Sequence, residues 1–381
     1  MNIILAGHAP WRPTGYGVQT KLSTEIFKAL GHQVTLLVVD SHGPGVIEWH
    51  GFDAYLPNRD RWGLDIIGTL CQITNSDLVI SIFDPWVLPM EGYRVAGRDW
   101  IGWFPVDQRP MPYHLTGQLE HMTQCVALST FGLNVMLSEK PKLMERFHAI
   151  PAPVDVSKFS LGDRQEARKI LGLPENAKVA GIVAANIAGD RKALAEQVEG
   201  WCIWAKSSGV QDARLLIHSD PFGAVNLAAL LDQYGCRDMA LFTSEWARAY
   251  GFSSHEQLAI LYRAMDVLLH ASAAEGFGLC IAEAMACGTP VIINNTTSMP
   301  ETSGNGHGRV IIGSDYQNKV WSPYGGWWSR PTAKGVAWAL ENFFTYDAQL
   351  YQNYESRVRV REEALRFAPE RIGEQWSKIL A

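Results

Sequence analysis

Short runs rich in Val and Ile recur along the chain with amphipathic helical patterns between them, and the series begins twice. The first five strand-like runs are NIILAG (2–7), QVTLLVVD (33–40), DLVISIFD (77–84), WIGWFPVD (100–107) and CVALST (125–130). The second five are KVAGIVAAN (178–186), ARLLIHSD (213–220), MALFTS (239–244), DVLLHAS (266–272) and TPVIINN (289–295). Strands that alternate with helices are typical of parallel sheets covered by helices. The pattern predicts an α/β protein with two Rossmann-like, doubly wound domains.

The boundary between the domains is predicted from the stretch IPAPVDVSKFSLGD, which contains two prolines and little periodicity. We expect an N-terminal domain at 1–150, a linker at 151–163 and a C-terminal domain at 164–365. A last helix at 366–381 is expected to pack back on the N-terminal domain. The 381 residues are enough for two domains of ordinary size. Two such domains facing each other form a cleft, and their ligands bind beyond the carboxyl ends of the strands.

Composition indicates which partners and which cellular compartment suit the chain. The 33 Lys and Arg residues against 39 Asp and Glu residues give a net charge of −6, which does not favour nucleic acid as a partner. No apolar stretch approaches the ~20 residues that a membrane-spanning helix needs. The six cysteines are dispersed and form no CxxC pair, which suits reduced thiols better than disulfides or a zinc site. We expect a cytoplasmic protein without a transmembrane segment.

The stretch AEGFGLCIAEAMACGTPVI (274–292) follows one of the predicted strands directly. Gly276 and Gly278 indicate a turn, LCIAEAMAC indicates a short helix, and Gly288 ends that helix. The start of a helix then lies at the carboxyl end of a strand, with free N–H groups and the positive end of its dipole aimed into the cleft. This geometry favours an anionic ligand.

The same stretch holds two carboxylates, Glu275 and Glu283, among apolar residues. Burying Glu283 without hydrogen-bond donors would be costly, and its neighbours on the predicted helix include no cation. Vicinal hydroxyls of a ribose could supply those donors, and Glu275 could bind a second sugar ring. The alternative is structural: Glu283 pairs with a distant Lys or Arg, and Glu275 lies in a solvated loop.

The run LAILYRAMDVLLHASAAEGFGLCIAEAMACGTPVIINNTTSMPE (258–301) resembles the C-terminal-domain signature of family 4 glycosyltransferases. These are retaining enzymes of GT-B fold that use nucleotide sugars, and their E-x7-E element corresponds to Glu275 and Glu283. The resemblance implies that Glu275 contacts hydroxyls of the transferred sugar and that Glu283 binds the ribose. It also implies that the backbone of four residues faces phosphate and sugar: Gly276, Phe277, Gly278 and Leu279. In this family the N-terminal domain is the acceptor side and the C-terminal domain binds the nucleotide sugar.

The segment AANIAGDRKAL follows the first strand of the second series, where the family usually has an arginine and, five residues later, a lysine. Asn186 holds the arginine position here, Arg191 holds the lysine position, and Lys192 follows. One or both cations could neutralise a diphosphate leaving group, because fixed positive charge stabilises charge that develops on phosphate oxygens. Cations on a helix surface are also common, so a purely structural role is the alternative.

In the N-terminal domain, RPTGYGVQT (12–20) places Gly15 and Gly17 in a loop before the first predicted helix. A dinucleotide fingerprint would need a third glycine, and Thr20 stands there instead. The resemblance implies that Gly15, Tyr16 and Gly17 approach the phosphates and sugar of the donor.

Two strand ends complete the predicted site. Asp107 ends a strand where many family members carry a histidine near the reacting sugar. It could orient the acceptor hydroxyl or stabilise positive charge at the anomeric carbon, or it could cap the next loop. Ser244 ends LFTS, which resembles the strand end whose backbone reads the base, and it replaces a glycine often found there.

These features predict a hexosyltransferase that moves a sugar from a UDP- or GDP-sugar to an acceptor hydroxyl. The resemblance implies that the transfer occurs with retention. No DxD triplet occurs, so we expect no metal and no cofactor besides the donor. The acceptor stays open among a glycan, a lipid carrier, a protein, a small metabolite and a modified base. The alternatives are a nucleotide-sugar epimerase or phosphorylase of the same fold, and a catalytically silent scaffold that binds a nucleotide sugar.

Overall fold

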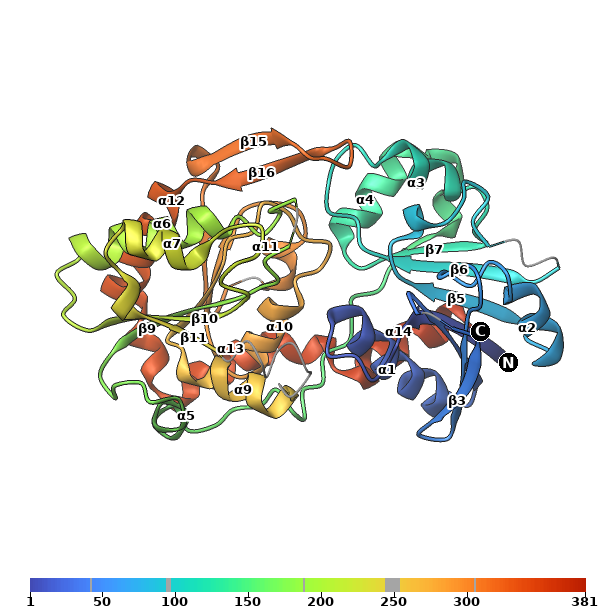
Figure 1. The fold of residues 1–381 in the computed structure, drawn as a ribbon, viewed down its shortest axis with the longest axis horizontal. Helices are drawn as coiled ribbons and strands as arrows, with labels where there is room; N and C mark the ends of the chain where they lie inside the picture. Colours follow the sequence, from blue (N-terminus) through green and yellow to red (C-terminus); the bar gives the residue numbers. More distant parts are fainter. Residues whose placement is uncertain (42, 94–96, 188, 244–253, 305) are drawn as a thin grey trace. The chain divides into compact units, whose positions relative to one another are not determined.

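The computed structural model describes residues 1–381 except 42, 94–96, 188, 244–253 and 305, and it divides the chain into two compact units (Figure 1). Unit 1 consists of Met1–Pro153, Tyr324–Gly326 and Phe367–Ala381, and unit 2 of Val154–Pro323 and Trp327–Arg366. The change from unit 1 to unit 2 at Pro153 and Val154 falls within the segment where a linker was expected. None of the helices described is long and apolar enough to cross a membrane.

Unit 1 is built on an eight-stranded sheet with the order β3-β4-β2-β1-β5-β6-β7-β8. All neighbouring strands are parallel except β3 and β4, which form an antiparallel pair. The strands are β1 (Asn2–His8), β2 (Gln33–Val39), β3 (Gly45–Trp49), β4 (Phe52–Leu56), β5 (Leu78–Ile82), β6 (Asp99–Phe104), β7 (Gln124–Ala127) and β8 (Phe147–Ala149).

Helices cover both faces of this sheet, so apolar side chains of β1 and β5 are buried on either side. Residues of α1 and α14 pack on one face, and residues of α2, α3 and α4 lie against the other. The α-helices are α1 (Gly15–Ala29), α2 (Ile67–Ile73), α3 (Tyr113–Gln118), α4 (Thr130–Glu139) and α14 (Pro369–Ile379). Short 3₁₀ turns occupy Pro85–Val87 and Pro141–Arg146.

The C-terminal helix α14 packs on the N-terminal sheet through Trp376, which is fully buried. Its ring contacts Phe27 and Trp103 edge-on, with centroids 5.2 and 5.0 Å away. The helix α14 begins at Pro369, within the segment 366–381 where a last helix was expected, and Phe367–Ala381 belong to unit 1.

Replacing Trp376 with Ala is expected to lower the free energy of unfolding of unit 1 by about 3–5 kcal/mol, because it removes a large buried ring from a closed core. Trp376→Phe should cost much less, since the indole N–H has no hydrogen-bond partner among the described residues. Urea unfolding of both variants tests this, with the exposed Lys378→Ala as the control. A loss below 1 kcal/mol for Trp376→Ala would show that α14 is not part of the core.

Unit 2 is built on a six-stranded, fully parallel sheet with the order β11-β10-β9-β12-β13-β14, followed by an antiparallel hairpin of β15 and β16. The sheet strands are β9 (Lys178–Val183), β10 (Ala213–His218), β11 (Ala240–Phe242), β12 (Val267–His270), β13 (Val291–Asn294) and β14 (Arg309–Ile312). The hairpin strands are β15 (Gln317–Trp321) and β16 (Trp327–Pro331).

The helices of unit 2 also lie on both faces of their sheet. Alternate residues of β9, β10 and β12 pack against α6, α7 and α12, and in Figure 1 the helices α5, α9 and α13 lie on the other side. The α-helices are α5 (Arg164–Leu171), α6 (Leu194–Ser207), α7 (Leu227–Gln233), α9 (His255–Ala264), α10 (Leu279–Ala286), α11 (Met299–Thr302), α12 (Ala333–Asn342) and α13 (Tyr354–Ala364). Shorter helical turns lie at Arg237–Met239, Ser314–Tyr316, Phe343–Asp347, Leu350–Gln352 and Leu365–Phe367.

All ten predicted strand runs contain a strand, so the α/β class with two parallel, helix-covered sheets is confirmed. The sequence pattern missed β3, β4, β8, β14 and the β15–β16 hairpin. Most of β3 and β15 is exposed or half-buried and lacks the continuous apolar run of a central strand. The six cysteines are all free thiols, and five of them are buried, as expected from their dispersal.

Candidate functional site

The predicted site in unit 2 forms at the carboxyl edge of its sheet. Glu275 lies in the turn between β12 and α10, and Arg191 and Lys192 lie in the loop that leads from β9 to α6. Parallel strands end at the same edge of a sheet, so two loops separated by about eighty residues in sequence meet there. The structure therefore brings together three residues that the sequence had assigned to different parts of a donor.

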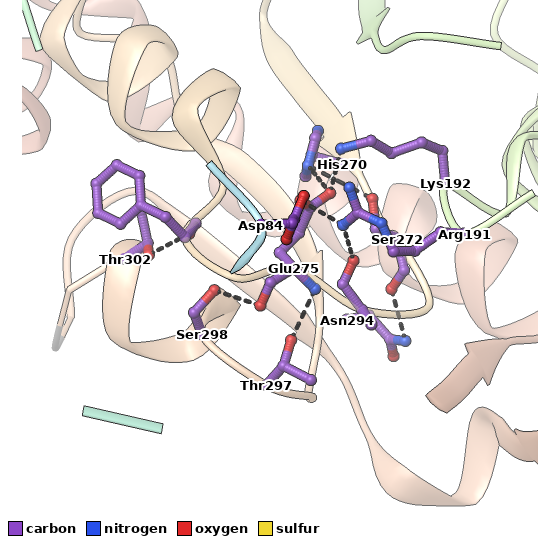
Figure 2. Close-up of polar contacts among 12 residues, drawn as sticks. Asp84, Arg191, Lys192, His270, Ser272, Glu275, Asn294, Thr297, Ser298 and Thr302 are labelled. Atoms are coloured by element: carbon purple, nitrogen blue, oxygen red, sulfur yellow. Dashed lines mark hydrogen bonds and ion pairs between the residues drawn. The ribbon is translucent and has the colours of Figure 1, made fainter. Parts of the chain in front are cut away.

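Three side chains converge on the Glu275 carboxylate, which is 5% exposed (Figure 2). The Arg191 Nη1 donates to Oε2 at 2.8 Å, and the Lys192 Nζ donates to Oε1 at 2.6 Å. The His270 Nε2 lies 3.0 Å from the same Oε1. We call Glu275, Arg191, Lys192 and His270 the acid–cation cluster.

The electrostatics of the cluster keep Glu275 ionised. Burial would raise the pKa of Glu275, but Arg191, Lys192 and the hydrogen bond from His270 outweigh it and hold this pKa well below its usual range. Burial lowers the pKa of His270, against the pull of Glu275, so the imidazole is neutral at pH 7 and donates through Nε2. Two cations thus share one carboxylate within the cluster.

The backbone of Glu275 is fixed as firmly as its side chain. Its N–H donates to the Thr297 Oγ1 at 2.9 Å, and its carbonyl accepts from the Ser298 Oγ at 2.8 Å. These partners follow β13, whose last residue Asn294 donates to the Ser272 carbonyl at 3.0 Å. Contacts from two strand ends therefore hold the carboxylate in place (Figure 2).

The cation loop is tied to the same turn. The Arg191 Nη1 also donates to the Ala274 carbonyl at 2.6 Å, and the Arg191 carbonyl accepts from the Ala273 N–H at 2.8 Å. The Lys192 carbonyl accepts from the Gln197 Nε2 at 2.6 Å. Backbone and side-chain contacts together fix the direction in which both cations point.

The turn Gly276–Gly278 leads into α10 as the sequence predicted. Gly278 has φ 92°, which favours glycine, and no side chain caps the helix there. Among the described residues no acceptor takes the N–H groups of Leu279 and Cys280. The Phe277 carbonyl, in contrast, accepts from the Thr302 Oγ1 at 2.5 Å. The start of α10 offers two free donors and positive dipole charge to an anion.

Glu283 lies on α10 and is 8% exposed. The Tyr262 hydroxyl of α9 donates to its Oε2 at 2.7 Å, and among the described residues Tyr262 is the one donor to this carboxylate. Burial raises the pKa of Glu283 to about 7, and the hydrogen bond from Tyr262 opposes this only in part. The sequence had correctly excluded helix neighbours as cationic partners, but it gave no sign of Tyr262.

Replacing Glu283 with Gln is expected to raise the stability of unit 2 at pH 8 and to leave it nearly unchanged at pH 4.5. Between its ordinary pKa near 4.5 and the folded value of about 7, the folded state holds a proton that the unfolded state has lost. Stability therefore falls as pH rises through this window, by at most about 3 kcal/mol. Urea unfolding at both pH values measures the difference, with the exposed Glu362→Gln as the control. Equal effects at both pH values would contradict the raised pKa.

The Asn186 side chain forms hydrogen bonds to backbone groups after β10. Its Nδ2 donates to the Asp220 and Val225 carbonyls, each at 2.7 Å, and its Oδ1 accepts from the Val225 N–H at 2.9 Å. Both amide protons are thus engaged in holding the segment after β10 against the end of β9. Contact between this side chain and a donor stays a prediction that would require these bonds to be exchanged.

The predicted N-terminal residues all lie in unit 1. Gly15 and Gly17 were expected in a loop, but they belong to the first turn of α1, because the Thr14 Oγ1 accepts from the Gly17 N–H at 3.2 Å and caps the helix. A Cβ on Gly17 would lie 2.4 Å from the Arg12 carbonyl oxygen, which explains the glycine. The Tyr16 hydroxyl donates to Asp84 at 2.7 Å.

The two remaining predicted positions are Asp107 and Ser244. Asp107 follows β6 and is half-buried, and its role at the reacting sugar stays a prediction. Ser244 lies outside the described residues. Within the described part of the chain, no group of three or more His, Cys, Asp or Glu side chains is placed to hold a metal ion.

Sequence reasoning missed His270 and Tyr262. His270 is the last residue of β12 and a polar residue at the end of an apolar run, five positions before Glu275, and this signal could have marked it. Tyr262 lies on the buried side of α9, where an aromatic residue resembles any core residue. Its hydroxyl becomes informative only when the packing of α9 and α10 is known.

Part of this site lies in a segment that matches a known protein family. Residues 226–320, which include Glu275 and Glu283, match the family described as Glycosyl transferases group 1. A D-inositol 3-phosphate glycosyltransferase of Mycolicibacterium smegmatis is 32% identical over 176 residues, which cover 45% of this chain and 37% of that relative. The chain thus spans well under half the length of this curated relative.

Solved structures match over nearly the whole chain. Sucrose-phosphate synthase from Thermosynechococcus elongatus has a TM-score of 0.75 at 18% identity and covers 100% of this chain and 98% of its own. HepE of Anabaena, solved in complex with UDP-glucose, has a TM-score of 0.71 at 15% identity and covers 100% of this chain and 99% of its own. Residues 226–320 thus match the Glycosyl transferases group 1 family, and the chain as a whole has the fold of GT-B glycosyltransferases.

Proposed function

We propose that the chain is a retaining glycosyltransferase of family 4 that transfers a hexose from a nucleotide diphosphate sugar to an acceptor hydroxyl without a bound metal. The observation that carries this proposal is the acid–cation cluster beside the free start of α10. Two cations next to two free N–H groups are an environment suited to a diphosphate.

The donor would bind along the carboxyl edge of the unit 2 sheet. Arg191, Lys192 and the N–H groups of α10 would receive the diphosphate oxygens, and Glu283 would accept hydrogen bonds from ribose hydroxyls. UDP-sugars are the first choice of donor, because HepE is solved with UDP-glucose and shares the fold. Turnover with different nucleotide sugars decides which base and which sugar the donor carries.

The reaction breaks the bond between the anomeric carbon and a phosphate oxygen and forms a bond from that carbon to the acceptor oxygen. The nucleoside diphosphate leaves with the bonding electrons, and the acceptor proton passes to a base. As the bond breaks, negative charge builds on the leaving phosphate, which Lys192 and Arg191 would stabilise. Glu275, ionised and held in place, would accept hydrogen bonds from hydroxyls of the sugar and keep the cations in position.

Turnover of a panel of UDP-, GDP-, ADP- and TDP-sugars tests the proposal through release of free nucleoside diphosphate. We expect release with at least one donor in the presence of EDTA and faster release when a hydroxyl acceptor is added. The anomeric coupling constant of the product, measured by proton NMR, is expected to show retention. No release from any donor, with Glu275→Ala indistinguishable from the parent protein, would exclude transfer. Acceptor-independent interconversion of sugars, or cleavage that needs phosphate, would identify an epimerase or a phosphorylase.

A further inference from the structure

The β15–β16 hairpin contacts the backbone that carries the acid–cation cluster. The Ser329 N–H donates to the Ala273 carbonyl at 3.2 Å, and the Ser329 carbonyl accepts from the Asn294 Nδ2 at 2.6 Å. Next to it, Trp328 is buried in a small cluster with Ala273 and Ala274. The strand β16 is therefore hydrogen-bonded to the ends of β12 and β13, directly before Glu275.

The next residue of the same strand, Arg330, reaches across to the cation loop. Its guanidinium binds Glu196 in the first turn of α6 through two bonds, Nε to Oε1 at 2.5 Å and Nη2 to Oε2 at 3.1 Å. The Nη2 also donates to Asp190, which directly precedes Arg191. Two parallel bonds to one carboxylate fix the plane of the guanidinium, which a lysine could not do.

The loop that Arg330 holds has an unfavourable backbone. Asp190 and Ala193 both lie in the left-handed region, with φ 41° and 49°, and they flank Arg191 and Lys192 on either side. Non-glycine residues keep such conformations only where surrounding contacts enforce them, and they concentrate at functional sites. The Asp190 Oδ1 also accepts from the Leu194 N–H at 3.4 Å, so one carboxylate joins the hairpin to the start of α6.

Arg330 also controls the charge around the cluster. Within the described part of the chain, the ion pairs of Asp190 and Glu196 are both with Arg330. Hydrogen bonds to Glu196 and Asp190 raise the pKa of Arg330, against burial, so its charge is permanent. Without Arg330, both carboxylates would lose their cationic partner within a few residues of Arg191 and Lys192 and would compete with a phosphate for these two cations.

We propose that Arg330 is a positioning residue for transfer: from the β15–β16 hairpin, it holds the loop Asp190–Ala193 so that Arg191 and Lys192 face the donor diphosphate. This inference rests on the proposed function for the identity of the ligand, but the ordering of the loop can be measured without one. The Arg330 guanidinium is engaged with Glu196 and Asp190, so its loss acts on the two cations through the loop that carries them.

Hydrogen–deuterium exchange on the unliganded protein tests the positioning directly. The N–H groups of Ala193, Leu194 and Gln197 are hydrogen-bonded in the folded loop. In Arg330→Leu we expect their exchange to be at least tenfold faster. The control is Arg214→Leu on β10, which breaks a 2.8 Å ion pair between Arg214 and Asp212. Unchanged exchange in Arg330→Leu, or equal acceleration in Arg214→Leu, would overturn the proposal.

Donor turnover supplies the second readout. Arg330→Leu is expected to lower kcat at least thirtyfold and to raise KM for the donor less than fivefold, because leaving-group stabilisation is realised mainly in the transition state. Arg330→Lys should recover part of kcat. If Arg330→Leu does not fold, Glu196→Gln weakens the same clamp and should give a smaller change of the same kind. A normal kcat in both variants would overturn the proposal. If the parent protein turns over no nucleotide sugar, the proposed function is contradicted. The hydrogen–deuterium exchange experiment then decides alone whether Arg330 positions the loop.

Discussion

Glu275→Gln is expected to lower kcat/KM for the nucleotide sugar by about 10³-fold or more. The substitution keeps the size of the side chain but removes the negative charge that Arg191 and Lys192 share, and it places an amide NH₂ where cations now donate. Both the sugar contact and the arrangement of the cations depend on this carboxylate, so the effects on binding and on the transition state combine.

The same substitution has a stability effect with a defined pH dependence. Removing one partner of a buried ion pair costs about 3–5 kcal/mol. The depressed pKa of Glu275 means that its contribution is present above its ordinary pKa near 4.5 and is lost as pH falls through the lower folded value. The difference in unfolding free energy between the parent and Glu275→Gln should therefore shrink in acid.

Nucleotide release, measured well below the unfolding temperature, reports the effect of Glu275→Gln on activity. Urea unfolding at pH 7 and pH 4 measures its effect on stability. The control is Glu362→Gln, an exposed glutamate on α13 that should change neither quantity. Glu275→Gln with more than a tenth of the parent activity would contradict the role of this carboxylate.

Lys192→Ala is expected to lower kcat by about 10²–10³-fold, with a smaller change in KM for the donor. The Lys192 side chain is 19% exposed, and under the proposed function its Nζ would leave Glu275 for a diphosphate oxygen. Loss of one preorganised charge at a leaving group has a cost of about 3–4 kcal/mol in the transition state. Lys192→Arg should recover part of the rate, because it restores the charge with a different shape.

Steady-state kinetics with one donor, varied at a saturating acceptor concentration, measure this prediction. Lys206→Ala is the matched control, because Lys206 lies exposed in the last turn of α6, the helix that follows Lys192. Should Lys192→Ala raise KM alone and leave kcat intact, Lys192 would bind the ground state without stabilising the leaving group.

The fold was predictable where a strand is buried on both faces of its sheet, because such a strand has a continuous apolar run in the sequence. The central strands β1, β5, β9 and β12 have such runs. The hairpin β15–β16 has exposed tryptophans, glycines and a proline, which indicate a loop as readily as a strand. The position of the hairpin beside β12 depends on long-range hydrogen bonds, such as that from the Ser329 N–H to the Ala273 carbonyl. A local sequence pattern does not predict such bonds.

The site was predictable as a set of residues but not as a set of contacts. Spacing and resemblance identified Glu275, Arg191 and Lys192, yet they assigned the acid to a sugar and the cations to phosphates. The meeting of all three follows from the topology, because β9 and β12 are neighbours in the sheet. Asn186 illustrates the converse: its position predicts a donor contact, which stays a prediction, and in the structure its amide holds a backbone segment.

Isothermal titration of UDP- and GDP-sugars into the parent protein and Lys192→Ala tests the central claim most directly. The account predicts one binding site per chain for at least one nucleotide sugar and at least tenfold weaker binding of the corresponding nucleoside diphosphate to Lys192→Ala, with Lys206→Ala unchanged. Absence of binding by every nucleotide sugar, or equal affinity of the parent and Lys192→Ala, would show that the acid–cation cluster is not a donor-phosphate site.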